Sequence, residues 1–189
     1  GDSVIFLAHQ WNFFPGKQYT PSDFNEKKVT GGTFLTLGSF GNFSLGNTSE
    51  ASNGTATYRL TLSLPDTART YSLYLPEIFS AYTLYLNEEK VCSQGNPDPA
   101  HYKDLIGNKE ISFTASGTVH ITIIVTNYSH IYSGITYPPV FGTVTAIQKY
   151  LSTRLFISGI TLAAIFLFAA CSLFFFCRLK HKNALIFTI

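Results

Sequence analysis

Short stretches within residues 1–150 alternate apolar and polar side chains, which is typical of β-strands with one face on a core and the other in water. In the stretch 57–64, Leu60, Leu62 and Leu64 fall on one face, and the residues between them are polar. Comparable stretches occupy residues 71–75, 82–86, 110–113, 119–125 and 140–147. Turn-forming residues separate many of them, and this spacing predicts an all-β fold, an antiparallel sandwich.

A different pattern follows, because the run 155–177 is apolar and carries no charge. As a helix it would rise about 34 Å, and a bilayer core is about 30 Å thick, so the run predicts a transmembrane helix. The alternative is a buried helix of a large soluble protein. Basic residues flank the run, with Lys149 and Arg154 before it and Arg178, Lys180 and Lys182 after it. The excess after the run favours a cytoplasmic location for that flank.

These two patterns divide the chain. We expect an extracytoplasmic β-sandwich sensor domain over residues 1–148 and a short connector over 149–154. The transmembrane helix, 155–177, precedes a basic cytoplasmic loop, 178–183. A second apolar run starts at 184–189 and predicts a second transmembrane helix that is cut off, so we interpret the chain as a fragment of a longer membrane protein.

Composition narrows the function classes. The formal net charge is +2, and no basic stripe or arginine cluster is present, so no nucleic-acid partner is expected. Cys92 is the single cysteine before residue 155, so the β-domain has no internal disulfide. Asn-x-Ser/Thr sequences occur at Asn42, Asn47, Asn53 and Asn127. Because Cys92 is unpaired, we favour a bacterial domain, in which these sequences arise from composition, over a glycosylated secretory one.

Motifs along the chain occur in an order that resembles a known family. They are WNFFPG at 11–16, GTATYRL at 54–60, SAYTLYLN at 80–87 followed by Gly95, and VTNYSH at 125–130 followed by Gly134. Ahead of a membrane helix, this set resembles the extracellular domain of bacterial seven-transmembrane receptors with diverse intracellular signalling modules, over most of residues 9–177. The resemblance implies a galactose-binding-like jelly roll outside the cell, seven helices, and a cytoplasmic output such as a histidine kinase or a diguanylate cyclase.

One position departs from the family pattern. The hairpin that follows residue 86 usually carries Asn-Gly, whereas this chain has Asn87-Glu88. A two-residue Asn-Gly turn needs positive φ at both positions, which glutamate adopts less readily than glycine. We therefore expect a longer loop that extends through Glu89.

The candidate ligand-binding residues lie mainly in predicted loops, where sandwich domains often place binding groups. They are Trp11, His101, Tyr102, Asn127, His130 and Tyr132. Trp11 offers a flat face for stacking on a sugar, but packing in the core is the alternative, because its motif lies in a strand. Asn127 equally suits a structural role, in which its amide satisfies backbone groups of a loop.

Patterns for catalysis and metal binding are missing from the sequence. No G-x-S-x-G or H-E-x-x-H motif is present, and the acidic residues are scattered, whereas glycoside hydrolysis needs two carboxylates across a cleft. Asp98, Asp104 and Glu110 offer oxygen ligands for calcium, but no calcium-loop motif contains them. We assign no catalytic site, cofactor or metal to this chain. Enzymatic activity would belong to a kinase or cyclase module elsewhere in the full-length protein.

The resulting hypothesis is an extracytoplasmic ligand-sensing domain of a multi-pass receptor in a bacterial cell membrane. It would relay the binding of a small molecule, with carbohydrate as one option, to an output module outside this chain. The expected partners are the lipid bilayer, this ligand and a second copy, because Ser158, Gly159, Ala163 and Ala164 would let membrane helices pack closely as a homodimer. The alternative is a membrane-anchored carbohydrate-binding or adhesion module without signalling output.

Overall fold

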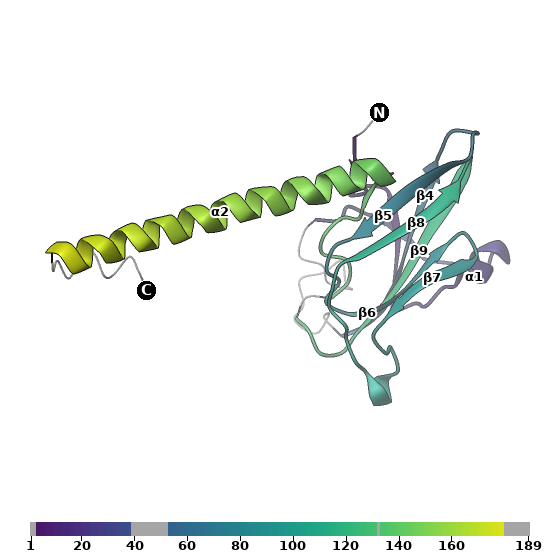
Figure 1. The fold of residues 1–189 in the computed structure, drawn as a ribbon. Coiled ribbons are helices and arrows are strands. Elements are labelled where there is room, and N and C mark those ends of the chain that lie inside the picture. The colour runs from purple at the N-terminus through teal and green to yellow at the C-terminus, as the bar shows by residue number, and fades with distance from the viewer. Residues whose placement is uncertain (1–2, 39–52, 132, 180–189) are drawn as a thin grey trace. The chain divides into compact units, whose positions relative to one another are not determined.

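The computed structural model describes residues 3–38, 53–131 and 133–179. The chain divides into two compact units, Gly1–Ile147 and Gln148–Ile189. The first unit is built mainly from β-strands, and the described part of the second is helical (Figure 1).

Two antiparallel sheets make up the first unit. The four-stranded sheet has the order β1–β10–β5–β8, formed by Ile5–Phe6, Val140–Thr143, Arg69–Leu75 and Lys109–Ala115. The six-stranded sheet has the order β3–β2–β4–β9–β6–β7, formed by Thr33–Leu35, Trp11–Pro15, Gly54–Ser63, Thr118–Asn127, Ala81–Leu86 and Glu89–Gln94. Two short helices, α1 (Pro21–Asn25) and the 3-10 helix η2 (Pro99–His101), lie in the connections. The predicted antiparallel β-sandwich followed by a helix is confirmed.

The core lies between the inner faces of the two sheets. At the centre of the six-stranded sheet, Tyr58 of β4 is opposite Ile123 of β9, and both side chains are buried. Phe13 and Leu84 extend this inner face on the neighbouring strands, and Leu73 of β5 is buried on the other sheet. Along each strand these residues alternate with residues on the outer face, which is the period of two that the sequence predicted.

The hairpin between β6 and β7 corrects one prediction. Leu86 pairs directly with Glu89, so the turn contains Asn87 and Glu88 and is not the longer loop that we expected. Of these two residues Asn87 takes the positive φ, at 52°, which asparagine tolerates better than most residues. The turn is held by β9, because the Asn87 backbone N–H donates to the His120 carbonyl at 2.7 Å and Asn87 Oδ1 accepts from the His120 backbone N–H at 2.9 Å. A two-residue turn therefore forms without glycine.

The chain passes from β10 into α2 (Val144–Leu179) with no intervening loop. The predicted last strand, 140–147, is therefore wrong in its second half, which is helical. Thr143 ends the strand by capping the helix, since its Oγ1 accepts from the Ala146 backbone N–H at 3.2 Å. Ala146 and Ile147 are buried within the first unit, and their apolar character is what extended the strand pattern in the sequence.

Beyond residue 147, α2 exposes apolar side chains such as Phe166. The segment 149–154, predicted as a connector, is part of this helix. Thr161 donates its hydroxyl to the Ile157 carbonyl at 2.9 Å, so this polar group is satisfied inside the helix. Among the described residues α2 is the one helix long and apolar enough to cross a membrane, and the crossing itself stays a prediction. Residues 180–189, with most of the predicted basic loop and the predicted second helix, lie outside the described residues.

Candidate ligand-binding groove

The segment 17–28 lies against the outer face of the six-stranded sheet. The Tyr19 backbone N–H donates to Thr57 Oγ1 at 2.8 Å, and the Thr57 hydroxyl donates in turn to the Lys17 carbonyl at 2.8 Å. Because Thr57 alternates with the inner-face Tyr58 along β4, these bonds fix the segment on the face that points away from the core. We call residues 17–28 the covering segment.

Aromatic packing holds the covering segment in place. The ring of Phe14, from β2, makes edge-to-face contacts with Tyr19 and Phe24, with 5.5 Å between ring centroids in each pair. The guanidinium of Arg59, from β4, lies 4.0 Å from the centroid of the Phe24 ring, and burial there lowers the pKa of Arg59. These contacts remove apolar surface from water and add a cation–π interaction, so the covering segment is packed onto the sheet.

Helix α1 begins inside the covering segment at a local hydrogen-bond network. Both the hydroxyl and the backbone N–H of Thr20 donate to Asp23 Oδ2 at 2.7 Å, and Pro21 takes the first helical position, where its missing N–H costs nothing. The two bonds from Thr20, first the hydroxyl and then the backbone N–H, hold the pKa of Asp23 below its ordinary value. Thr20 is thereby fixed in position beside the sheet.

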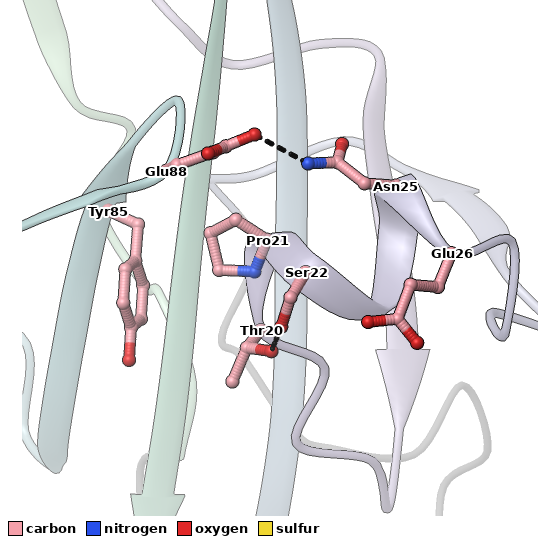
Figure 2. A pocket seen from close by; sticks show the side chains of 7 residues that line it. All are labelled: Thr20, Pro21, Ser22, Asn25, Glu26, Tyr85 and Glu88. Carbon is pink, nitrogen blue, oxygen red and sulfur yellow. Dashed lines mark hydrogen bonds between the residues drawn. The ribbon is translucent and has the colours of Figure 1, made fainter.

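Between the covering segment and strands β6 and β9 runs a groove with two lobes, which we call the outer-face groove. The open lobe has a volume of about 460 Å³ and is lined by Thr20, Pro21, Ser22, Asn25, Glu26, Tyr85 and Glu88 (Figure 2). The narrow lobe has a volume of about 180 Å³ and is lined by Gln18, Thr20, Tyr82, Thr83, Tyr85, Pro97, Ile124 and Thr126. Thr20 and Tyr85 line both lobes, so the lobes adjoin at these two side chains.

A hydrogen bond between α1 and the β6–β7 turn bounds the open lobe. Asn25 Nδ2 donates to Glu88 Oε1 at 2.6 Å, and Figure 2 shows these two side chains meeting. The neighbouring Glu26 forms an ion pair with Lys28. Glu88 stands where the receptor motif that the sequence resembles usually has glycine, and here its side chain joins two walls of the groove.

The lining suits a ligand that carries many hydroxyl groups. The hydroxyls of Thr20, Ser22, Thr83 and Thr126 line the groove and can accept hydrogen bonds, and Gln18 and Asn25 add side-chain amides. In Figure 2 the ring of Tyr85 lies across the open lobe from Thr20 and Pro21, where it offers an apolar face to a ligand. A concave site with one aromatic surface and several polar groups is typical of small-molecule binding.

The surroundings of the two carboxylates of the open lobe differ from those of a proton-donating carboxyl group. Glu26 and Glu88 are both exposed to solvent. Each is engaged by a neighbour, Glu26 by Lys28 and Glu88 by Asn25. A carboxyl group that donates a proton in glycoside hydrolysis usually lies in an apolar pocket, and neither of these groups does.

None of the described residues predicted from the sequence as ligand-binding lines the outer-face groove. Trp11 is fully buried, its Nε1 donates to the Leu7 carbonyl at 2.7 Å, and its ring meets Tyr58 edge-on with 6.5 Å between centroids. The core position weighed as the alternative is therefore the one that the structure shows for Trp11. Tyr132 lies outside the described residues.

Tyr102, Asn127 and His130 do come together, at the end of β9. The Tyr102 hydroxyl donates to Asn127 Oδ1 at 3.4 Å, and Asn127 Nδ2 donates to the His130 carbonyl at 2.6 Å. Asn127 is 0% exposed, and its side-chain amide closes the turn to His130. The nitrogen to which a glycan would be attached in this Asn-x-Ser sequence therefore lies inside the fold. His101 is exposed and contacts Asp98 at 3.0 Å, a bond that holds the pKa of Asp98 below its ordinary value.

Metal ligands do not gather in the part of the chain that the structure describes, where no group of three or more His, Cys, Asp or Glu side chains comes together. The acidic residues weighed as calcium ligands contact different partners. Asp98 contacts His101, Asp104 Oδ2 accepts from a serine hydroxyl at 3.1 Å, and Glu110 Oε1 accepts from another at 2.9 Å.

The outer-face groove was not predicted because its walls are distant in the sequence. One signal was present, since Thr20-Pro21-Ser22-Asp23 is a typical helix start. A second was Tyr85, an aromatic residue on the polar face of its strand. Neither signal tells which strand the helix start will meet, so the sequence supplied the parts of the site without their arrangement.

Comparison with known proteins shows the fold. No family model and no curated protein matches the sequence. A β-glucuronidase of Faecalibacterium prausnitzii is 15% identical, with 73% of this chain and 31% of that chain covered and a TM-score of 0.57. A β-glucuronidase of an uncultured Clostridium is 17% identical, with 75% of this chain and 29% of that chain covered and a TM-score of 0.53. A β-galacturonidase of Eisenbergiella tayi, from glycoside hydrolase family 2 and bound to galacturonate, is 13% identical. The match covers 75% of this chain and 24% of that chain, with a TM-score of 0.51.

These likenesses define a class of domain and no more. The chain spans less than a third of the length of these three enzymes. What it shares with them is a β-sandwich of the kind that these carbohydrate-active enzymes contain. The resemblance to the extracellular domain of seven-transmembrane receptors stays a prediction from the sequence motifs.

Proposed function

We propose that the β-sandwich is a carbohydrate-binding sensor domain anchored to a bacterial cell membrane by α2, and that the sugar binds in the outer-face groove. The observation that carries this proposal is the lining of the groove, in which the Tyr85 ring lies among the hydroxyls and amides of the covering segment and of β6 and β9. The sandwich fold, found also in glycoside hydrolases, supports a sugar as the ligand by analogy of fold.

The test is an isothermal calorimetric titration of the full chain, in lipid nanodiscs, with neutral disaccharides. Tyr85→Ala removes the aromatic surface and is expected to weaken binding about tenfold or more. The matched control is Tyr128→Ala, which removes an exposed tyrosine outside the groove and should leave the affinity unchanged. If Tyr128→Ala or His130→Ala removes binding and Tyr85→Ala does not, the site lies at the end of β9. Absence of binding by every sugar would refute the proposed function.

Membrane anchoring follows from the exposure of the apolar side chains of α2, because such a surface is costly in water and is satisfied in lipid. Removal of residues 155–189 should release the protein from bacterial membranes into the soluble fraction. For the orientation, Asp66→Cys places a thiol on an exposed turn of the sandwich. A membrane-impermeant maleimide should label this variant in intact cells, and labelling confined to broken cells would contradict an extracytoplasmic domain.

The signalling part of the proposal uses the direct passage from β10 to α2. The groove belongs to the six-stranded sheet and β10 to the four-stranded sheet, so a ligand would have to bind two states of the sandwich differently to change α2. The alternative is a membrane-anchored binding or adhesion module without output. The coding sequence beyond Ile189 distinguishes the two, since further helices and a kinase or cyclase favour the receptor and an early stop favours the module.

A homodimer through α2 is a further part of the proposal. Gly159 and Ala163 are small residues one helical turn apart, a spacing that allows close helix packing. Gly159→Leu should lower the fraction of cross-linked dimer in membranes, with Thr153→Leu, outside this spacing, as the control. An unchanged dimer fraction in Gly159→Leu would place the contact elsewhere.

A further inference from the structure

The two lobes of the outer-face groove differ in charge. Glu26 and Glu88 line the open lobe, whereas the lining of the narrow lobe carries no charged side chain. Among the described residues, no lysine, arginine or histidine lines either lobe. A ligand in the open lobe therefore meets negative potential, and a ligand in the narrow lobe meets hydroxyls, an amide and the apolar side chain of Ile124.

Glu88 is the less compensated of the two carboxylates. Glu26 is paired with the ammonium of Lys28. Glu88 accepts from the neutral amide of Asn25 through Oε1, which leaves Oε2 to a ligand. The hydrogen bond from Asn25 orients the carboxylate without neutralising its charge, so Glu88 presents a full negative charge to the open lobe.

The position of Glu88 is set before a ligand arrives. The turn that carries it is bonded to β9 through both the N–H and the Oδ1 of Asn87, and the side chain is bonded to α1 through Asn25. Binding therefore requires little ordering of this group, and preorganisation of this kind favours affinity.

We propose that the groove selects glycans that carry a free amino group, with a protonated amino sugar beside Glu88 in the open lobe and a neutral ring in the narrow lobe. The selection excludes uronic acids from the open lobe, because a second carboxylate there would be repelled. This inference rests on the proposed function and adds the charge of the sugar to it.

The experiment compares three disaccharides of one shape by calorimetry on the full chain in neutral-lipid nanodiscs. They are the β-1,4-linked disaccharide of glucosamine and glucose, cellobiose, and the cellobiose derivative with one glucuronic acid. At low ionic strength the amino disaccharide is expected to bind about three- to fivefold tighter than cellobiose, and the uronic acid weaker by a similar factor. The preference should shrink as salt is added, because the charges are near the surface. Spermidine, an amine without a sugar ring, is expected to bind far more weakly.

Glu88→Gln is the decisive variant, because glutamine keeps an oxygen that accepts from Asn25 and loses the charge. It should bind cellobiose with unchanged affinity and lose the preference for the amino disaccharide. Asp66→Asn removes the same charge from an exposed turn outside the lining, so it should keep the preference. Circular dichroism and the thermal midpoint confirm that both variants are folded.

The outcomes separate this inference from the function beneath it. If no disaccharide binds, the proposed function fails and this inference fails with it. If sugars bind with equal affinity whatever their charge, or if spermidine binds as well as the amino disaccharide, the charge selection is wrong and sugar binding stands. If Glu88→Gln keeps the preference, Glu88 is not the selecting group.

Discussion

The two faces of the six-stranded sheet are built by the same strands but stabilised in different ways. On the inner face, Phe13, Tyr58 and Ile123 are buried against the opposite sheet. On the outer face, Thr57 and Arg59 flank Tyr58 along β4 and are covered in part by the covering segment. The inner face is filled, whereas the outer face keeps a groove beside the covering segment.

The difference teaches where stability and binding are located. An inner-face side chain is surrounded by other side chains and excluded from solvent, so its truncation leaves a cavity. An outer-face side chain at the groove is partly in water already, so its loss changes what can bind more than whether the chain folds. Substitutions on the two faces should therefore separate into those that change the free energy of unfolding and those that change affinity.

The largest effect is expected for Phe13→Ala. Phe13 is 0% exposed and its ring lies 4.9 Å from that of Tyr58, so removal of the ring should lower the free energy of unfolding by about 3–5 kcal/mol. Urea denaturation followed by tryptophan fluorescence measures the change, since Trp11 is buried in the same core. Phe34→Ala is the control, because Phe34 is 78% exposed. A similar loss in both variants would contradict the comparison.

The second-largest loss of stability is expected at Gly134, which lies against the inner-face residue Tyr58. A Cβ at Gly134 would lie 2.2 Å from the Tyr58 hydroxyl, and Gly134 has φ +80°. Gly134→Ala is therefore expected to cost about 2–4 kcal/mol, from the clash and from the left-handed backbone. Gly117→Ala has φ +66° with nothing within 4 Å of the added Cβ, so it isolates the cost of the backbone alone. Equal losses in the two variants would show that the clash is relieved.

A smaller change is expected when the covering segment is loosened. Phe24→Leu keeps an apolar side chain but removes the ring that packs on Phe14 and lies under Arg59. The free energy of unfolding should fall by about 1 kcal/mol, and the free energy of sugar binding should weaken by more than that. Calorimetry and urea denaturation on the same variant measure both. A loss of stability as large as that of Phe13→Ala would mean that the covering segment belongs to the core.

The smallest effect is a pH dependence on the outer face. Partial burial, and then the charge of Arg59, lower the pKa of His120 below its ordinary value of 6.5. On acidification the unfolded chain binds a proton at this site before the folded chain does, so stability is full above about pH 6.5 and falls below it. His120→Gln should flatten the decline of the thermal midpoint between about pH 7 and 5. An unchanged slope would assign the decline to other groups.

The sequence predicted the inner face well, and the reason is local. Leu60 repeats at a period of two with its neighbours, and burial of one face is enough to produce that pattern. The same rule failed after β10, because Ala146 and Ile147 are apolar at positions that fit a strand and also fit the buried side of a first helical turn. What decides is the cap made by Thr143, and a threonine is common in both settings.

The outer face could be predicted far less. Tyr85 and Thr57 mark a polar face but do not tell what lies against it. The contact of Asn25 with Glu88 joins residues 63 positions apart. In the sequence alone, Glu88 is only a residue that does not favour a tight turn. Its role follows from the packing of Phe24 and Tyr19 onto Phe14, a tertiary interaction with no local period.

The burial of Asn127 has a consequence for producing the protein. The Nδ2 atom that donates to the His130 carbonyl is the atom to which an N-linked glycan would be attached. In a eukaryotic secretory host, oligosaccharide transfer at this asparagine would compete with closure of the turn, and each chain modified first would be unable to complete its fold. Bacterial expression avoids that competition, and secretion from insect or yeast cells should yield less folded protein unless glycosylation is blocked.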